Sequence, residues 1–281
     1  MKLRICDTVN EAAMATAALV VEQLRKKPTS VLGLPTGQTA LPIYDALVGL
    51  HRAGRADFSQ VHTVNLDEFV GLSSADPGSF RGFMQQHLFR YINVPDDHVH
   101  FLAGDARDTD RECARFDRVI AGLGGIDLQL LGVGRNGHIG FNEPARDLKL
   151  RTHRVHLRPD TRRANAPSFG GRVSEVPREA LSIGMATILQ ARSIVLVALG
   201  ASKAPAVASA FSGRISTDKP VSFLQLHSSV TVIVDRAAAA KLRALPLRTP
   251  RTLRELATTE DTEGIRRGAA KRRRQVERSE M

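Results

Sequence analysis

The sequence predicts an α/β fold: an open, mostly parallel sheet with helices on both faces. Short runs rich in Val, Ile and Leu recur along the chain, and segments with helical spacing of apolar residues separate them. Several runs are apolar throughout, as expected for strands that are buried on both faces. Most lead into a turn rich in glycine or polar residues, which is typical of βαβ units.

Length and composition fit this class. The 281-residue chain, with 42% hydrophobic and 25% charged residues, is long enough for a sizeable core and resembles soluble globular proteins. No apolar run approaches the roughly 20 residues that span a bilayer, and the N-terminus lacks a signal-peptide pattern. Cys6 and Cys113 are too few for a disulfide framework or a metal site. We therefore predict a cytoplasmic protein with reduced thiols, no bound metal and no membrane contact.

The net charge of +11 is concentrated at the C-terminus. From Arg236 onward the chain has 13 Lys and Arg against 6 Asp and Glu, a net charge of +7, which leaves +4 for the rest. We therefore predict a domain over residues 1–246 and a basic, flexible extension over residues 247–281. A solvated terminus is the favoured interpretation of the extension. Nonspecific binding of nucleic acid is the weaker alternative.

The first predicted unit joins a strand, a turn and a helix. Residues 2–6 predict a strand, and Thr8 or Asn10 can cap a helix over residues 11–25. The next strand, residues 31–34, runs into a Gly/Thr turn before a helix over residues 41–53. Free N–H groups and the helix dipole could hold an anion there. From these residues alone, an ordinary helix cap explains the turn equally well.

Two carboxylates follow the next strand. Residues 61–66 predict a buried strand, and Asp67 and Glu68 stand at its end. Adjacent carboxylates suit a functional site, although a surface loop would also tolerate them. Helices are predicted over residues 81–91 and 108–123.

The central stretch, residues 128–144, reads LQLLGVGRNGHIGFNEP. It begins as a buried strand over residues 126–133 and enters a glycine-rich turn. His138 and Glu143 then follow, two groups that can transfer protons near neutral pH. We interpret this stretch as the candidate active-site loop.

The remaining chain continues the alternation. A polar, Arg-rich segment over residues 145–158 and a Gly-rich flap over residues 169–177 precede a predicted helix over residues 179–190. Further strands are predicted over residues 193–199 and 230–235. The first of these leads to Lys203 and an Ala-rich helix, and a last helix is expected over residues 237–245.

Parallel strands bring their C-terminal ends to one edge of the sheet, so the polar groups at these ends can share a site. The first unit has no Gly-x-Gly-x-x-Gly fingerprint, which argues against a dinucleotide-binding site. The chain has no Walker A motif, which argues against a phosphate-binding P-loop.

Several motifs, in collinear order over about residues 1–236, resemble the glucosamine-6-phosphate deaminase (isomerase) family. They are LGLPTGQT, NLDEFVGL, GVGRNGHIGFNEP, DTRRAN, LGASKA and SFLQLH. The related 6-phosphogluconolactonases share a glycine-rich GH segment, but NLDE and FNEP look like the deaminases. The resemblance implies conversion of an amino sugar 6-phosphate to fructose 6-phosphate and ammonia, without a cofactor.

The resemblance also implies roles for residues. Asp67 matches the base that removes the C2 proton, and His138 matches the acid/base of ring opening, with Glu143 as its partner. Asn136 stands where many members have Asp. An amide can orient a neighbouring group by hydrogen bonds but cannot take a proton. We still place Asn136 in the ring-opening group, with its role reduced to orientation. The implied phosphate site comprises Thr36, Gly37, Gln38, Thr39, Arg162 and Lys203. Gln38 and Ala40 replace smaller or more rigid residues of the family turn.

Alternative functions remain open at this point. The altered turn could favour galactosamine 6-phosphate over its epimer. A sugar-phosphate sensor without turnover, with a tail that contacts nucleic acid, would need the phosphate site but not Asp67, His138 and Glu143. A homo-oligomer is also open, because the sequence does not fix the assembly.

Overall fold

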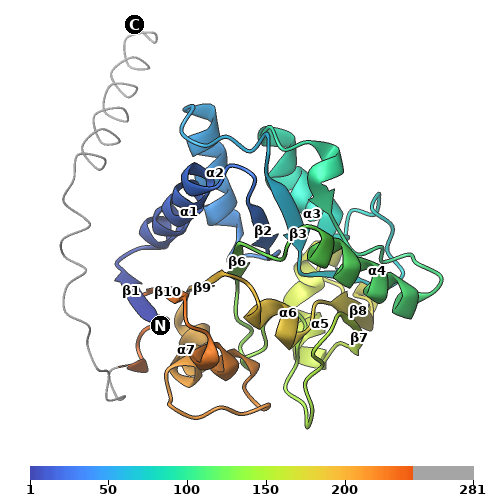
Figure 1. The fold of residues 1–281 in the computed structure, drawn as a ribbon. Coiled ribbons are helices and arrows are strands. Elements are labelled where there is room, and N and C mark those ends of the chain that lie inside the picture. The colour runs from blue at the N-terminus through green and yellow to red at the C-terminus, as the bar shows by residue number, and fades with distance from the viewer. Residues whose placement is uncertain (243–281) are drawn as a thin grey trace, which may run out of the picture. The chain divides into compact units, whose positions relative to one another are not determined.

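The computed structural model describes residues 1–242 (Figure 1). The predicted domain boundary and the basic extension over residues 247–281 lie outside the described residues. Within residues 1–242, no helix is both long and apolar enough to cross a membrane.

A seven-stranded parallel sheet forms the centre of the fold. Every strand pairs in parallel with its neighbours. The strand order is β1 (Lys2–Cys6), β10 (Val230–Asp235), β9 (Ser193–Ala198), β6 (Leu128–Leu131), β2 (Val31–Leu34), β3 (His62–Asn65) and β5 (Val99–His100). The predicted α/β class and its parallel sheet are confirmed.

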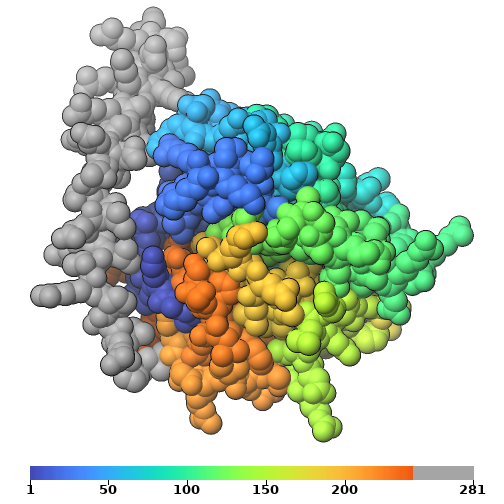
Figure 2. Space-filling view, in the orientation of Figure 1, coloured from blue at the N-terminus to red at the C-terminus, as the bar shows by residue number. Residues whose placement is uncertain are grey.

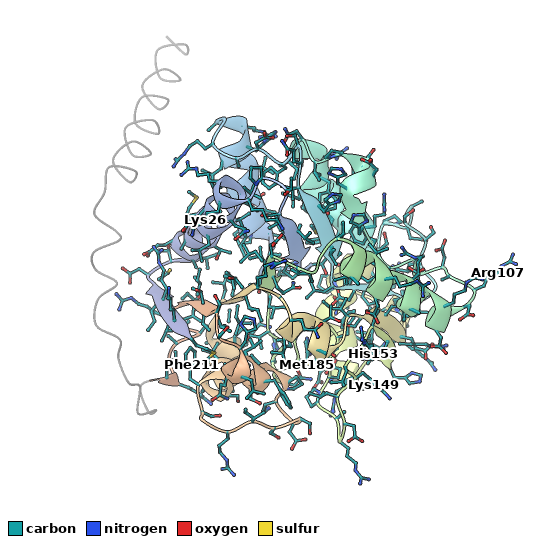
Figure 3. The ribbon with its side chains drawn as sticks, in the orientation of Figure 1. Lys26, Arg107, Lys149, His153, Met185 and Phe211 are labelled. Carbon is teal, nitrogen blue, oxygen red and sulfur yellow. The ribbon has the colours of Figure 1, made fainter. Side chains whose placement is uncertain are left out.

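Alternate residues of each strand pack into two separate apolar clusters, because successive side chains point to opposite faces. In β9, Val195 and Val197 join the cluster formed with α1 (Val9–Lys26) and α2 (Leu41–Arg52), whereas Leu196 joins the cluster formed with α4 (Thr109–Gly122) and α7 (Ala204–Ala210). Figure 1 shows α1 and α2 on one side of the sheet and α7 on the other, and in Figure 2 the blue atoms of α1 and α2 lie above the orange atoms of α7. Met185 and Phe211 lie on the α7 side in Figure 3, away from Lys26 at the end of α1.

Local sequence signals determine several helix ends. Thr8 caps α1 by accepting a hydrogen bond from the Glu11 N–H at 3.1 Å, as predicted. Asp108 caps α4 in the same way, and α4 ends before Gly124, whose φ of +79° suits glycine. The other helices are α3 (Phe80–His87), α5 (Pro159–Asn165), α6 (Met185–Leu189) and the 3₁₀ segments η1 (Phe89–Tyr91), η2 (Asp96–His98), η3 (Ala166–Phe169), η4 (Val173–Glu175), η5 (Ala201–Lys203) and η6 (Pro220–Leu226).

The strand order reverses direction between β2 and β6. From β2 the chain builds outward through β3 to β5, then returns to β6 on the other side and continues through β9 to β10. Open α/β sheets bind ligands beyond the strand C-termini at such a switch point. The turn after β2 contains residues 36–39, and the turn after β6 leads into His138 and Glu143. Two of the predicted site segments therefore flank the switch point.

A second, three-stranded antiparallel sheet, β4 (Asp67–Phe69), β8 (Glu179–Ser182) and β7 (His153–His156), was not predicted. The predicted helix over residues 179–190 is wrong: residues 179–182 form the central strand of this sheet, and only Met185–Leu189 are helical. Pairing with strands on both sides outweighs the weak helix preference of this segment.

Two smaller expectations are also corrected. The polar stretch before Arg158 contains strand β7. The chain over residues 236–241 forms turns, so the described part of the last predicted helix contains no α-helix.

Gly104 gives a test of how tightly β4 is held. A Cβ at this position would lie 2.2 Å from the carbonyl oxygen of Phe69 and 2.7 Å from that of Leu72. We expect Gly104→Ala to lower the free energy of unfolding by about 1–3 kcal/mol, because the backbone beside β4 must move. Urea denaturation measures the change.

The control is Gly49→Ala in α2, where nothing lies within 4 Å of the added Cβ. This variant should equal the wild type or gain up to about 1 kcal/mol. Equal stability of the Gly104→Ala variant and the wild type would contradict the close packing.

Candidate active site

Glu143 is the centre of a buried hydrogen-bond network. Its side chain is 6% exposed and lies 3.4 Å from Nδ1 of His138 through Oε2. The same oxygen accepts a hydrogen bond from Nδ2 of Asn136 at 2.7 Å, and Oε1 accepts one from the Thr161 hydroxyl. Burial opposes the charge of Glu143, but His138, Thr161 and Asn136 outweigh it and lower the pKa of this carboxyl. Glu143 is therefore held as a carboxylate facing the imidazole.

The glycine-rich turn gives His138 its position. A Cβ at Gly134 would lie 2.2 Å from Cε1 of His138, so only glycine leaves room for the ring. The Gly134 N–H donates to the His138 carbonyl at 2.9 Å, and the His138 N–H donates to Oδ1 of Asn136 at 3.1 Å. Asn136 thus links the backbone of His138 to the carboxylate of Glu143.

Asp67 and Glu68 lie on β4 and are both buried, at 7% and 2% exposure. Burial, with a smaller contribution from the Glu68 charge, raises the pKa of Asp67 to about 8. Burial also raises the pKa of Glu68 to about 7, although its carboxylate accepts backbone N–H bonds from Phe69, Phe80 and Arg81 at 2.8, 2.9 and 3.1 Å. These bonds fix Glu68 to the start of α3, and Asp67 has no comparable partner among the described residues.

Asp67 lies against the loop that contains His138. A Cβ at Gly140 would be 3.6 Å from Oδ2 of Asp67 and 3.1 Å from Oγ of Ser182, which pairs with Asp67 across β4 and β8. Ser182 also accepts the Phe141 N–H at 3.0 Å. The structure therefore brings Asp67 next to the segment that carries Asn136, His138 and Glu143.

The turn of Thr36, Gly37, Gln38 and Thr39 lies directly before α2, which begins without a side-chain cap. Gly37 has a φ of +98°, and nothing lies within 4 Å of the position of a Cβ there. The carbonyl of Pro35 accepts the hydroxyl of the fully buried Tyr44, which fixes the turn to the helix. An uncapped helix start beside an open turn is a suitable place for an anion.

The two predicted cations of the phosphate site differ in placement. Lys203 donates from Nζ to the Val133 carbonyl at 2.7 Å, which places its ammonium at the turn after β6. Arg162 instead donates to the carbonyls of Val173 and Val176 in the Gly-rich flap, through Nε and one terminal nitrogen. Within residues 1–242, the hydrogen bonds of the Arg162 side chain all go to these two carbonyls and none to another predicted site residue.

Thr161 is a site residue that the sequence reasoning missed. It lies beside Arg162 in the DTRRAN segment, so the family motif indicated the correct segment but not this residue. Its 3% exposure and its bond to Glu143 arise from the packing of α5, which no local pattern reveals. Ser182 was missed for a similar reason, because its segment was interpreted as a helix.

Comparisons with known proteins agree with this geometry. A family model described as glucosamine-6-phosphate isomerases/6-phosphogluconolactonase matches residues 6–233. The chain belongs to this family.

The individual relatives are named as deaminases rather than as 6-phosphogluconolactonases. Glucosamine-6-phosphate deaminase of Geobacillus sp. (strain WCH70) is 46% identical over 241 residues, which cover 85% of this chain and 94% of the relative. Glucosamine-6-phosphate deaminase 2 of Bacillus subtilis (strain 168) is 45% identical over 245 residues, 87% of this chain and 98% of the relative.

A solved structure of a monomeric glucosamine-6-phosphate deaminase superposes with a TM-score of 0.83 at 43% identity, covering 86% of this chain and all of that chain. The 6-phosphogluconolactonase of Trypanosoma cruzi, with a TM-score of 0.68 at 18% identity, shares the fold.

The raised pKa of Asp67 leads to a stability prediction. In the unfolded chain Asp67 has a pKa near 3.8, so the folded state binds its proton more tightly and loses stability as the pH rises from about 4 to about 8. Asp67→Asn removes this penalty. We expect the free energy of unfolding of the variant, relative to wild type, to increase by roughly 2–4 kcal/mol between pH 5 and pH 8.

Urea denaturation at both pH values measures this difference. Asp45→Asn, at an exposed position on α2, is the control and should show no such trend. A pH-independent difference for Asp67→Asn would contradict the buried, proton-binding carboxyl.

Proposed function

We propose that this chain is a glucosamine-6-phosphate deaminase, which converts glucosamine 6-phosphate and water to fructose 6-phosphate and ammonia in amino sugar catabolism. The observation that carries the proposal is the placement of buried Asp67 against the loop that contains His138 and Glu143. Relatives of 45–46% identity over most of the chain bear this name.

Ring opening is the first step. The proton of the anomeric hydroxyl must leave and the ring oxygen must gain a proton, so one group that can accept and donate is sufficient. His138 takes this role, and the Glu143 carboxylate, 3.4 Å from Nδ1, faces the imidazole ring. Asn136 supports the pair by donating to Glu143 at 2.7 Å.

Isomerisation follows on the open-chain aldehyde. Asp67, in its ionised form, removes the C2 proton while the aldehyde oxygen gains a proton, which gives an enolamine. Return of the proton from Asp67 to C1 and loss of one from nitrogen give the imine of fructose 6-phosphate. Water then hydrolyses the imine to the ketone and ammonia. A buried carboxylate with a raised pKa is a stronger base than an exposed one. Its limited exposure also restricts loss of the abstracted proton to water.

Substrate binding relies on the phosphate. We assign it to the turn of Thr36, Gly37, Gln38 and Thr39, with the ammonium of Lys203 and the guanidinium of Arg162. The uncapped start of α2 and the ammonium of Lys203 at the neighbouring turn support this assignment. Arg162 would have to leave the Val173 and Val176 carbonyls, so its participation requires movement of the flap.

No organic cofactor is needed for these steps, since each is a proton transfer or a hydrolysis. Within residues 1–242, no group of three or more His, Cys, Asp or Glu side chains is arranged to hold a metal ion. The cytoplasm, where sugar phosphates are metabolised, is the proposed location. Binding of nucleic acid by the tail stays the weaker alternative to a solvated terminus, and homo-oligomer formation stays an open alternative.

Release of ammonia and fructose 6-phosphate from glucosamine 6-phosphate tests the function. We expect the wild type to release both, and Asp67→Asn to lower kcat by about 100- to 10,000-fold because the C2 base is lost. Asp45→Asn should retain wild-type kcat. A wild type that binds the substrate but releases neither product would identify a sensor and refute the proposal. Comparison with galactosamine 6-phosphate in the same assay determines the epimer preference.

Asn136→Asp tests the orienting role of the amide. The new carboxylate would lose the donor to Glu143 and place a second negative charge beside it, so the two would share a proton near neutral pH. We expect the acid limb of the kcat profile between pH 5 and 9 to move up by about one pH unit or more. The control Asn10→Asp is exposed at the start of α1. An unchanged profile for Asn136→Asp would contradict the proposed role.

A further inference from the structure

Two lysines and one arginine surround the turn after β6. Lys203 donates to the Val133 carbonyl at 2.7 Å, and Lys219 donates to the Asn136 carbonyl at 3.1 Å. Arg135 lies between these two carbonyls in the chain and is exposed. The methylene chain of Lys219 also covers Gly137, where a Cβ would lie 3.1 Å from Cδ of the lysine.

Within the part of the chain that the structure describes, these three cations have no protein counter-ion. Within residues 1–242, no salt bridge of 4 Å or less involves Arg135, Lys203 or Lys219. Burial first, and the charge of Arg135 second, lower the pKa of Lys203, so Arg135 is close enough to repel its ammonium. Like charges held together without an anion are unfavourable in the empty protein and favour an anionic ligand.

The position of the turn shows which anion it would meet. It follows β6 and borders the switch point, and β2, whose turn contains residues 36–39, pairs directly with β6. An anion on the uncapped start of α2 would therefore have the turn after β6 as its neighbour. The other predicted guanidinium, that of Arg162, is engaged with the Val173 and Val176 carbonyls. Among the described residues, by contrast, the guanidinium of Arg135 forms no salt bridge.

We propose that Arg135 binds the substrate phosphate together with Lys203, and so acts as a binding residue beyond the phosphate-site residues assigned above. This inference rests on the proposed function, because it takes the anion to be the 6-phosphate of the substrate. The planar guanidinium provides paired donors for two phosphate oxygens, and the lysine adds a point charge. Lys219 stabilises the turn by donating a hydrogen bond to the Asn136 carbonyl.

The experiment compares Arg135→Gln, Arg135→Lys and the control Arg118→Gln, which removes the same charge from an exposed position on α4. Steady-state kinetics with glucosamine 6-phosphate give kcat and KM. Calorimetry with inorganic phosphate gives a Kd that does not depend on turnover. Thermal unfolding shows whether each variant is folded.

We expect Arg135→Gln to raise KM and the phosphate Kd by a similar factor of about 10 to 100, with kcat within about threefold of wild type. The KM and phosphate Kd of Arg135→Lys should lie between those of Arg135→Gln and wild type, because the lysine keeps the positive charge and loses the paired donors of the guanidinium. Arg118→Gln should match wild type in both quantities.

A phosphate Kd that is equal in the Arg135→Gln and Arg118→Gln variants would overturn the inference. A fall in kcat at unchanged KM would also overturn it, since that result would place Arg135 in the chemical step. If the wild type binds phosphate but releases no ammonia, the proposed function fails, and the phosphate Kd still decides whether Arg135 binds the anion.

Discussion

The carboxylate of Glu143 connects two segments of the site, the glycine-rich turn after β6 and helix α5. It accepts hydrogen bonds from Asn136 in the glycine-rich turn and from Thr161 in α5, and it faces the imidazole of His138. A buried charge is tolerated only when it is paired and hydrogen-bonded, so removal of any partner leaves the others poorly satisfied. The position of His138, and with it ring opening, therefore depends on how α5 and the turn after β6 pack together.

The two halves of the site place their carboxyl groups in opposite environments. Glu143 has three polar partners, which lower its pKa, whereas Asp67 is buried without such partners and has a pKa raised to about 8. One carboxylate thus stays charged beside a histidine, and the other favours its protonated form below about pH 8. Groups with divergent pKa values support separate acid and base roles in one site. The two groups lie close together because β4 of the antiparallel sheet meets the loop after β6 of the parallel sheet at Gly140.

The sequence predicted the central strands of the parallel sheet because strands such as β2, β6 and β9 are buried on both faces and read as continuous apolar runs, whereas the short edge strand β5 was missed. The start of α1 at Thr8 and the end of α4 at Gly124 followed from capping chemistry that acts within a few residues. The antiparallel sheet was not predicted because β8 is stabilised by strands distant in sequence. Ser182, for example, pairs with Asp67 on one side and His153 on the other. The roles of Asp67, Asn136, His138 and Glu143 came from family motifs. The contact of Thr161 required the tertiary structure.

The account depends most on Asp67 as a shielded base that moves one proton from C2 to C1. Turnover of glucosamine 6-phosphate carrying deuterium at C2 tests this most directly, with the fructose 6-phosphate analysed for deuterium at C1. Because Asp67 is only 7% exposed, we predict that a measurable fraction of the label reaches C1 in the wild type, and that Asp67→Asn yields almost no product. Complete loss of the label to water in the wild type, together with sustained turnover by Asp67→Asn, would contradict the account.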